Sequence, residues 1–159
     1  MLRKLVLPSV VVALFAAVFV PTVAFTQDAQ EKAIETRRGF MKIVGWEAGP
    51  LFGMAKGDMA YDAKAALRHA DNLKIISQYP VGGLFLPGTS KDDRPGKTRS
   101  LAKIWGDMDG FGKALNDWKA AVAALQDKVG NGQGELAAAV GALGKSCGGC
   151  HKPYRAEEF

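Results

Sequence analysis

The sequence predicts an all-α protein, an antiparallel four-helix bundle, and two observations support this prediction. Apolar residues recur at steps of three and four in four separate segments, which is the spacing of one face of an α-helix. No segment after residue 24 alternates apolar and polar residues for long, as a half-buried strand would. The links between the first and second segments and between the third and fourth are short, which favours antiparallel neighbours.

The first two helices are bounded by residues that start and stop helices. The first is expected from about Asp28 to Lys56, with Gly57 as its stop, and Gly49-Pro50 predicts a kink or a brief break inside it. The second is expected to start near Asp62, whose carboxylate can cap the first turn, and to end before Pro80. The apolar positions on these helices include Ile34, Met41, Val44, Ala48, Ala55, Ala66, Ala70, Leu73 and Ile76.

A long loop should separate the second and third helices, because three Pro and four Gly lie between residues 80 and 98. The third helix shows the clearest pattern, a heptad seam from Leu101 to Val129 that ends at Gly130-Asn131-Gly132. Its apolar positions are Leu101, Ile104, Met108, Phe111, Leu115, Trp118, Val122, Leu125 and Val129. The fourth helix continues the same steps through Leu136, Val140, Leu143 and Cys147.

The N-terminus has the features of a secretory signal peptide. A basic start at Arg3 and Lys4 precedes an apolar run, and Thr22-Val23-Ala24 is a small-residue cleavage pattern. The alternative is an uncleaved anchor helix, but the apolar run is short for a bilayer span of about 20 residues. We therefore expect a signal peptide over residues 1–24, one domain over residues 25–159, and no stable membrane span after cleavage.

The charge of the chain bears on its partners. There are 21 Lys and Arg against 16 Asp and Glu, a formal net charge of +5 that falls to +3 without Arg3 and Lys4. The basic residues are spread along the chain rather than clustered, so we expect no nucleic-acid partner. A diffuse positive face can still steer an acidic protein partner.

The sequence Cys147-Gly148-Gly149-Cys150-His151 is the attachment pattern of a c-type haem. On one helical turn, two thiols at this spacing can form thioethers with the two vinyl groups of one porphyrin. The next residue, His151, then presents an imidazole nitrogen to the iron as an axial ligand. We therefore expect one covalently attached haem c, held by Cys147 and Cys150.

A redox-active dithiol and a structural zinc site both fit the cysteine pair less well. A thioredoxin-like motif should follow a strand in a βαβ unit, whereas the preceding residues predict a helix. A structural zinc site needs four ligands, and the chain has two Cys and two His, with His69 far away in sequence. Because haem attachment takes place outside the bacterial cytoplasm, the motif also agrees with export to the periplasm.

The bundle topology predicts which residues surround the haem. The fourth helix ends at the motif, so the same end of the bundle should hold the starts of the first and third helices, the end of the second, and the long loop. The residues expected there are Arg37, Arg38, Met41, Tyr79, Phe85, Thr89, Ser90, Trp105 and Met108. Of the five methionines, only Met41 and Met108 should reach this end.

A haem motif near the C-terminus of a four-helix bundle resembles the class II c-type cytochromes, the cytochrome c′ family. The likeness covers nearly all of the chain after the signal peptide. Its other markers are Arg37 with Met41-Lys42, Lys56-Gly57, Pro87-Gly88-Thr89, Ile104-Trp105 and Tyr154-Arg155.

This resemblance implies roles for individual residues. Low-spin members of the family place a Met four residues after an Arg, which matches Met41 after Arg37, so Met41 is expected as the second axial ligand and Met108 as the fallback. Arg37, with Arg38 beside it, is expected to bind a haem propionate, and Thr89 and Ser90 of the loop are expected at the cofactor. Arg155 lies four residues after His151, one helical turn further on, so it is expected on the proximal side of the haem.

Three functions are compatible with these residues. The favoured one is a periplasmic electron-transfer protein that exchanges electrons with other redox proteins. The alternative is a high-spin, five-coordinate cytochrome c′ that binds NO or CO. An enzyme such as a peroxidase is not expected, because no distal His-plus-Arg pair is visible near Met41. Members of the family occur as monomers and as dimers packed through their first two helices, so a homodimer is possible.

Overall fold

The computed structural model describes residues 27–159, and the expected signal peptide lies outside the described residues. The elements in this range are α1 (Gln27–Lys56), α2 (Ala63–Ser77), the 3₁₀ helix η1 (Val81–Leu84), α3 (Lys103–Gly106), α4 (Met108–Leu125) and α5 (Gln133–Tyr154). Within residues 27–159 the only β-type pairing is an isolated antiparallel bridge between Ser100 and Arg155. The prediction of an all-α four-helix bundle is therefore confirmed.

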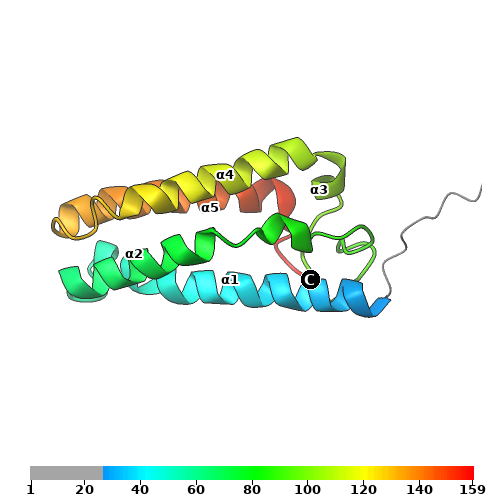
Figure 1. The fold of residues 1–159 in the computed structure, drawn as a ribbon, viewed down its shortest axis with the longest axis horizontal. Helices are drawn as coiled ribbons and strands as arrows, with labels where there is room; N and C mark the ends of the chain where they lie inside the picture. The colour runs from blue at the N-terminus through cyan, green and yellow to red at the C-terminus, as the bar shows by residue number, and fades with distance from the viewer. Residues whose placement is uncertain (1–26) are drawn as a thin grey trace, which may run out of the picture.

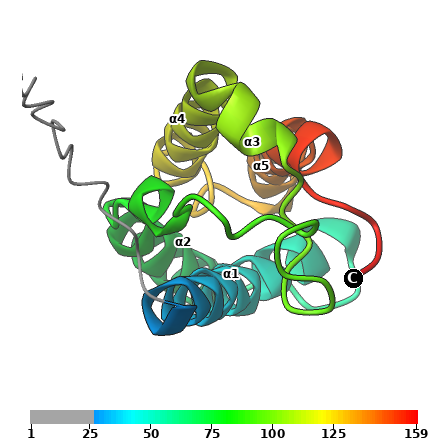
Figure 2. The same cartoon turned by 90° about the vertical axis from the view of Figure 1, so that its right-hand side faces the viewer.

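The four long helices lie side by side along one axis (Figure 1). α1 packs against α2 and α5, and α4 packs against α2 and α5, so the helices surround a shared core. Viewed end-on, α3 and the loop that follows η1 cover one end of the bundle (Figure 2). This end also holds the beginning of α1 and the end of α5, as the predicted topology requires. No described helix combines the length and apolar character needed to span a membrane.

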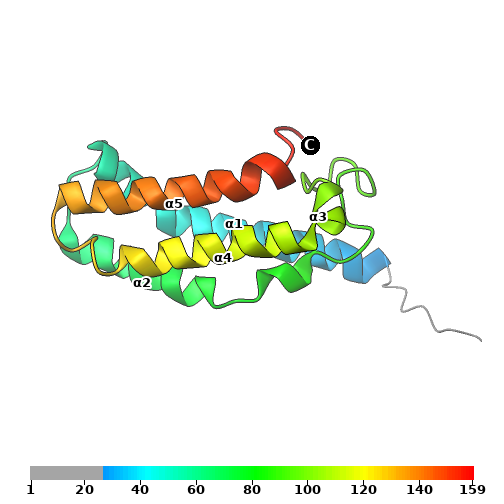
Figure 3. The same ribbon diagram turned by 90° about the horizontal axis from the view of Figure 1, so that it is seen from above.

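α1 stays helical through Gly49 and Pro50, so the brief break that the sequence allowed does not occur. The pyrrolidine ring removes one backbone donor, but buried side chains on both sides of it anchor the helix. Ala48, Leu51 and Met54 all lie in the core. The last turns of the helix lie out of line with its earlier part (Figure 3), which agrees with the predicted kink.

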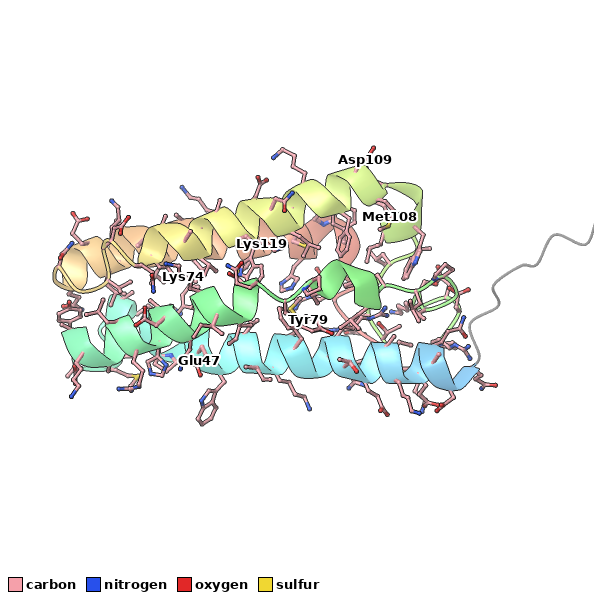
Figure 4. The ribbon with its side chains drawn as sticks, viewed as in Figure 1. Glu47, Lys74, Tyr79, Met108, Asp109 and Lys119 are labelled. Atoms are coloured by element: carbon pink, nitrogen blue, oxygen red, sulfur yellow. The ribbon has the colours of Figure 1, made fainter. Side chains whose placement is uncertain are left out.

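The third predicted helix is divided in two, which corrects the expectation of one continuous seam. Asp107 leaves the helical region (φ −146°, ψ 55°) and caps α4 by accepting a hydrogen bond from the backbone N–H of Gly110. The same carboxylate accepts a hydrogen bond of 2.6 Å from the Tyr154 hydroxyl. Met108 follows the break at the first turn of α4 (Figure 4), where its side chain is exposed.

Most of the large side chains that are fully buried lie toward the end of the bundle opposite α3, which we call the far end. Its large side chains are completely excluded from solvent; they include Leu51, Leu73, Val122, Leu125, Val129 and Leu136. The Tyr61 hydroxyl donates to the carbonyl of Val129 and accepts from the N–H of Gly132, joining the two links at this end. The far end is therefore closed by protein groups alone.

Candidate haem site

A cavity of about 400 Å³ opens at the other end of the bundle, which we call the haem end. Its wall combines apolar side chains with basic ones. The apolar and aromatic part is formed by Met41, Phe85, Ile104, Phe111, Leu115, Tyr154 and Phe159. The polar part includes Arg37, Arg38, Lys42, Thr98, Arg99, Ser100, Cys150, His151 and Arg155. Residues from three long helices, the long loop and the C-terminal tail thus meet at one site.

The cysteine motif lies in the last turns of α5, which remains helical to Tyr154. Cys150 lines the cavity, whereas Cys147 packs against the main core one turn earlier. The two thiols do not form a disulfide with each other, and burial raises the pKa of both. Two neutral thiols on one helical turn, one of which lines the cavity, fit thioether attachment better than a redox-active thiolate.

His151 also lines the cavity and is half-buried. Burial lowers the pKa of its imidazole, and the charges of Arg155 and Arg99 lower it further. The imidazole is therefore neutral near pH 7, which is the form that binds a metal. Residues 27–159 contain no cluster of three or more His, Cys, Asp and Glu side chains that could hold a metal ion. His151 is therefore not part of a metal site formed by protein side chains alone.

The two candidate methionines differ in position. Met41 of α1 lines the same cavity as His151, and its side chain is partly exposed, at 38%. Met108 does not line the cavity and is 47% exposed at the start of α4. Of the two predicted methionines, only Met41 therefore borders the cavity.

Arg37 is a buried cation whose hydrogen bonds go to neutral acceptors. Its Nη1 donates to the Thr89 hydroxyl at 2.8 Å, and its Nη2 donates to the Thr89 carbonyl at 2.6 Å and to the Thr98 hydroxyl at 2.9 Å. The guanidinium lies 4.7 Å from the centre of the Phe85 ring. Burial lowers its pKa to about 10, so the group stays charged at neutral pH.

No carboxylate within residues 27–159 forms an ion pair with Arg37, which is only 3% exposed. A buried charge without a counter-charge is costly unless a ligand supplies one. The carboxylate of a haem propionate fits this requirement. Arg38 is exposed beside it, lines the cavity mouth and donates to the backbone carbonyl of Lys97.

Thr89 and Ser90, which were predicted to contact the cofactor, do not line the cavity but lie behind Arg37. Thr89 is completely buried and holds the Arg37 guanidinium through two of its oxygen atoms. Ser90 hydrogen bonds to the carboxylate of Asp93, both through its hydroxyl and through its backbone N–H. The loop therefore orients the Arg37 guanidinium through hydrogen bonds on the side that faces away from the cavity.

The C-terminal tail contributes residues that the sequence pattern did not single out. The N–H of Ala156 donates to the carbonyl of Arg99, and the Arg99 side chain donates to the carbonyl of Glu157. These bonds place the Phe159 ring at the cavity mouth, between the guanidinium groups of Arg38 and Arg99 at 5.2 and 5.5 Å. No sequence signal identified this tail, because its position depends on pairing with a loop 58 residues earlier.

Comparison with known proteins agrees with this site. The family model described as Cytochrome C′ matches residues 32–155. The chain belongs to the cytochrome c′ family. A cytochrome c′ of Cereibacter sphaeroides is 44% identical over 154 residues, which cover 97% of this chain and 98% of the relative. A cytochrome c-554 of the same organism is 34% identical over 134 residues, covering 83% of this chain and all of the relative.

A solved structure of cytochrome c′ from Rhodobacter spheriodes has the same fold, with a TM-score of 0.79 and 46% identity over 81% of this chain and 98% of that chain. Cytochrome c′ family proteins carry one covalent haem c and are not enzymes, so both predictions are confirmed. Cys147 and Cys150 would hold the haem covalently, and the buried charge of Arg37 fits its propionates.

Proposed function

We propose that this protein is a periplasmic electron carrier in which His151 and Met41 bind the two axial positions of the haem iron. The observation that carries the proposal is that these two side chains, from α5 and α1, border the same cavity. The haem supplies one-electron chemistry through its Fe(III) and Fe(II) states. The protein supplies the ligands, the surrounding charge and the exclusion of water.

The proposed ligands suit electron transfer. A thioether is a soft, neutral ligand that favours Fe(II) and raises the reduction potential. When both axial positions are filled, the iron stays low-spin and its surroundings reorganise little. Neutral His151 and the apolar wall of Ile104, Phe111 and Leu115 provide a dry environment for this exchange.

The axial ligand can be tested by substitution of Met41. We expect the purified holoprotein to show a low-spin ferrous spectrum with a sharp α band and a ferric methionine-to-iron charge-transfer band in the near infrared. Met41→Ala should abolish that band, produce high-spin iron and lower the reduction potential. Met108→Ala, at an exposed methionine outside the cavity, is the matched control and should change neither spectrum. An unchanged spectrum in Met41→Ala would contradict the ligand assignment.

A second function is favoured by specific observations. Met41 is partly exposed, so its side chain has room to leave the iron open, and the chain is more similar to a cytochrome c′ than to a cytochrome c-554. One solved relative, at 25% identity and a TM-score of 0.69, is a nitric oxide complex of a cytochrome c prime variant from Alcaligenes xylosoxidans. Under this alternative the protein binds NO or CO. Rapid CO uptake by the ferrous protein, together with a high-spin spectrum, would establish it.

The proposed location and assembly follow the family. Export to the periplasm rests on the signal-peptide pattern of residues 1–24. A homodimer is compatible with exposed Ile43, Trp46 and Ile75 on α1 and α2. Sedimentation of the purified holoprotein over a concentration series would distinguish monomer from dimer.

A further inference from the structure

Four basic side chains surround the mouth of the haem cavity: Arg38, Lys42, Arg99 and Arg155, which we call the basic rim. Among the described residues, no acidic side chain lines this cavity. Within residues 27–159, no rim residue forms an ion pair. Arg38 and Arg99 donate instead to backbone carbonyl groups. The rim is therefore a concentration of positive charge that the protein itself does not neutralise.

The positive charge of residues 27–159 as a whole is also concentrated in the half that holds the basic rim. The haem half, residues 27–43, 79–115 and 145–159, has 13 Lys and Arg against 9 Asp and Glu, a net charge of +4. The far half, residues 44–78 and 116–144, has 6 against 7, a net charge of −1. The formal charge of +3 is therefore unevenly distributed, and the excess positive charge lies in the half that holds the cavity.

This positive charge persists when the cofactor is bound. A haem has two propionates, and the buried Arg37 guanidinium is positioned to neutralise one of them. Even if both propionates paired with rim residues, two of the four rim charges would remain free. The apolar ring of Phe159 is 55% exposed at the same mouth, where it contacts the guanidinium groups of Arg38 and Arg99. A basic border around an exposed apolar centre is typical of a protein interface.

We propose that the basic rim is a docking surface for the acidic face of an electron-transfer protein. This inference rests on the proposed function, since it assigns the partner of the same site. An acidic partner is attracted from a distance and oriented with its redox centre toward the cavity mouth. Binding there covers Phe159 and brings the partner to the side of the bundle where the haem is held.

The test uses the complete holoprotein and a reduced, acidic [2Fe–2S] ferredoxin as the probe. Reduction of the ferric haem is followed by stopped flow over a series of salt concentrations. For the wild type we expect a second-order rate that falls steeply as salt rises. Lys42→Glu should lower the rate about fivefold at low salt and flatten the salt dependence. The matched control is Lys64→Glu, an equal charge reversal at the exposed start of α2 in the far half, and it should change the rate less than about twofold.

Three results would overturn the docking surface. The first is a wild-type rate that does not fall with salt, and the second is an equal loss in Lys64→Glu and Lys42→Glu. The third is sedimentation with vesicles of anionic phospholipid that depends on Lys42, because the rim would then serve a membrane. Failure of the proposed function is read separately, from the spin state of the wild-type haem. A high-spin spectrum would reject Met41 ligation. The salt dependence of the rate would still test whether the basic rim is a docking surface.

Discussion

At the far end of the bundle the largest core side chains are completely excluded from solvent, whereas at the haem end the side chains border a cavity of about 400 Å³. The far end closes its links with its own groups, such as the Tyr61 hydroxyl. Within residues 27–159, the haem end leaves the Arg37 charge without a carboxylate. This difference indicates that the far end supplies most of the stability of the bundle. The haem end needs the cofactor to fill its cavity and to neutralise its buried charge.

The largest expected effect is loss of the haem without loss of the bundle. Cys147→Ala combined with Cys150→Ala removes both thioether positions, so no haem should stay attached after denaturation. Haem staining of a denaturing gel measures this, and circular dichroism should still show a helical protein, because the far-end core is intact. Gly149→Ala, between the two cysteines and with open space at its Cβ position, is the control and should keep the haem. An unfolded double variant would show that the far end does not hold the fold alone.

A cavity in the far-end core should destabilise the whole protein. Leu136 is completely buried, and Leu136→Ala is expected to lower the free energy of unfolding by about 2–5 kcal/mol. Chemical denaturation followed by circular dichroism measures the change, and the visible spectrum of the folded protein should stay the same. Ala137→Ser, at the exposed neighbouring position, should change stability little. A shifted visible spectrum in Leu136→Ala would contradict the separation of the two ends.

At the haem end, the hydrogen bond from Tyr154 to Asp107 joins the end of α5 to the start of α4. Tyr154→Phe should lower the melting temperature by about 5 °C, because the carboxylate loses a buried partner. The bond to Asp107 raises the pKa of Tyr154 to about 12, above the ordinary value of about 10. Its contribution is therefore complete below pH 10 and is lost as the pH rises toward 12. Melting curves from pH 7 to 12 should converge for the two proteins; parallel curves would contradict this role.

The smallest effect on stability is expected from a substitution in the His69–Glu47 pair, which joins α1 and α2. His69 Nδ1 lies 2.7 Å from a carboxylate oxygen of Glu47, and both side chains are largely buried. Figure 4 labels Glu47 on α1. Burial raises the pKa of Glu47, but hydrogen bonds from His69 and Asn72 outweigh it and hold the pKa below its usual value. The contribution is therefore present above about pH 4.3 and is lost as the pH falls through the lowered pKa.

Glu47→Gln should cost about 0.5–1 kcal/mol at pH 7, and this difference should disappear in acid. The matched control is Glu135→Gln, because the ion pair between Glu135 and Lys128 is exposed and 3.5 Å long. That substitution should have almost no effect at either pH. Denaturation at pH 7 and pH 3 measures both variants. An equal loss in the two would show that burial of the Glu47 pair contributes nothing.

The sequence by itself determined the helical class, the antiparallel topology and the haem attachment, because these depend on short-range spacing. Steps of three and four placed Trp118, Val122 and Leu125 in the core, and the cysteine motif is complete within five residues. Chain order then predicted that Met41 and His151 meet at one end, since adjacent helices in a bundle alternate in direction. Both residues line the same cavity, as this topology requires.

Only the tertiary structure decided how that end is assembled, because its contacts join residues far apart in the chain. The third helix is interrupted at Asp107, whose carboxylate accepts a hydrogen bond from Tyr154, 47 residues away, and the neighbouring Met108 is exposed. Thr89 supports Arg37 across 52 residues instead of lining the site. No periodic pattern encodes such pairs, since polar groups are matched by three-dimensional proximity rather than by spacing. The same proximity gathers four separate basic residues into one rim.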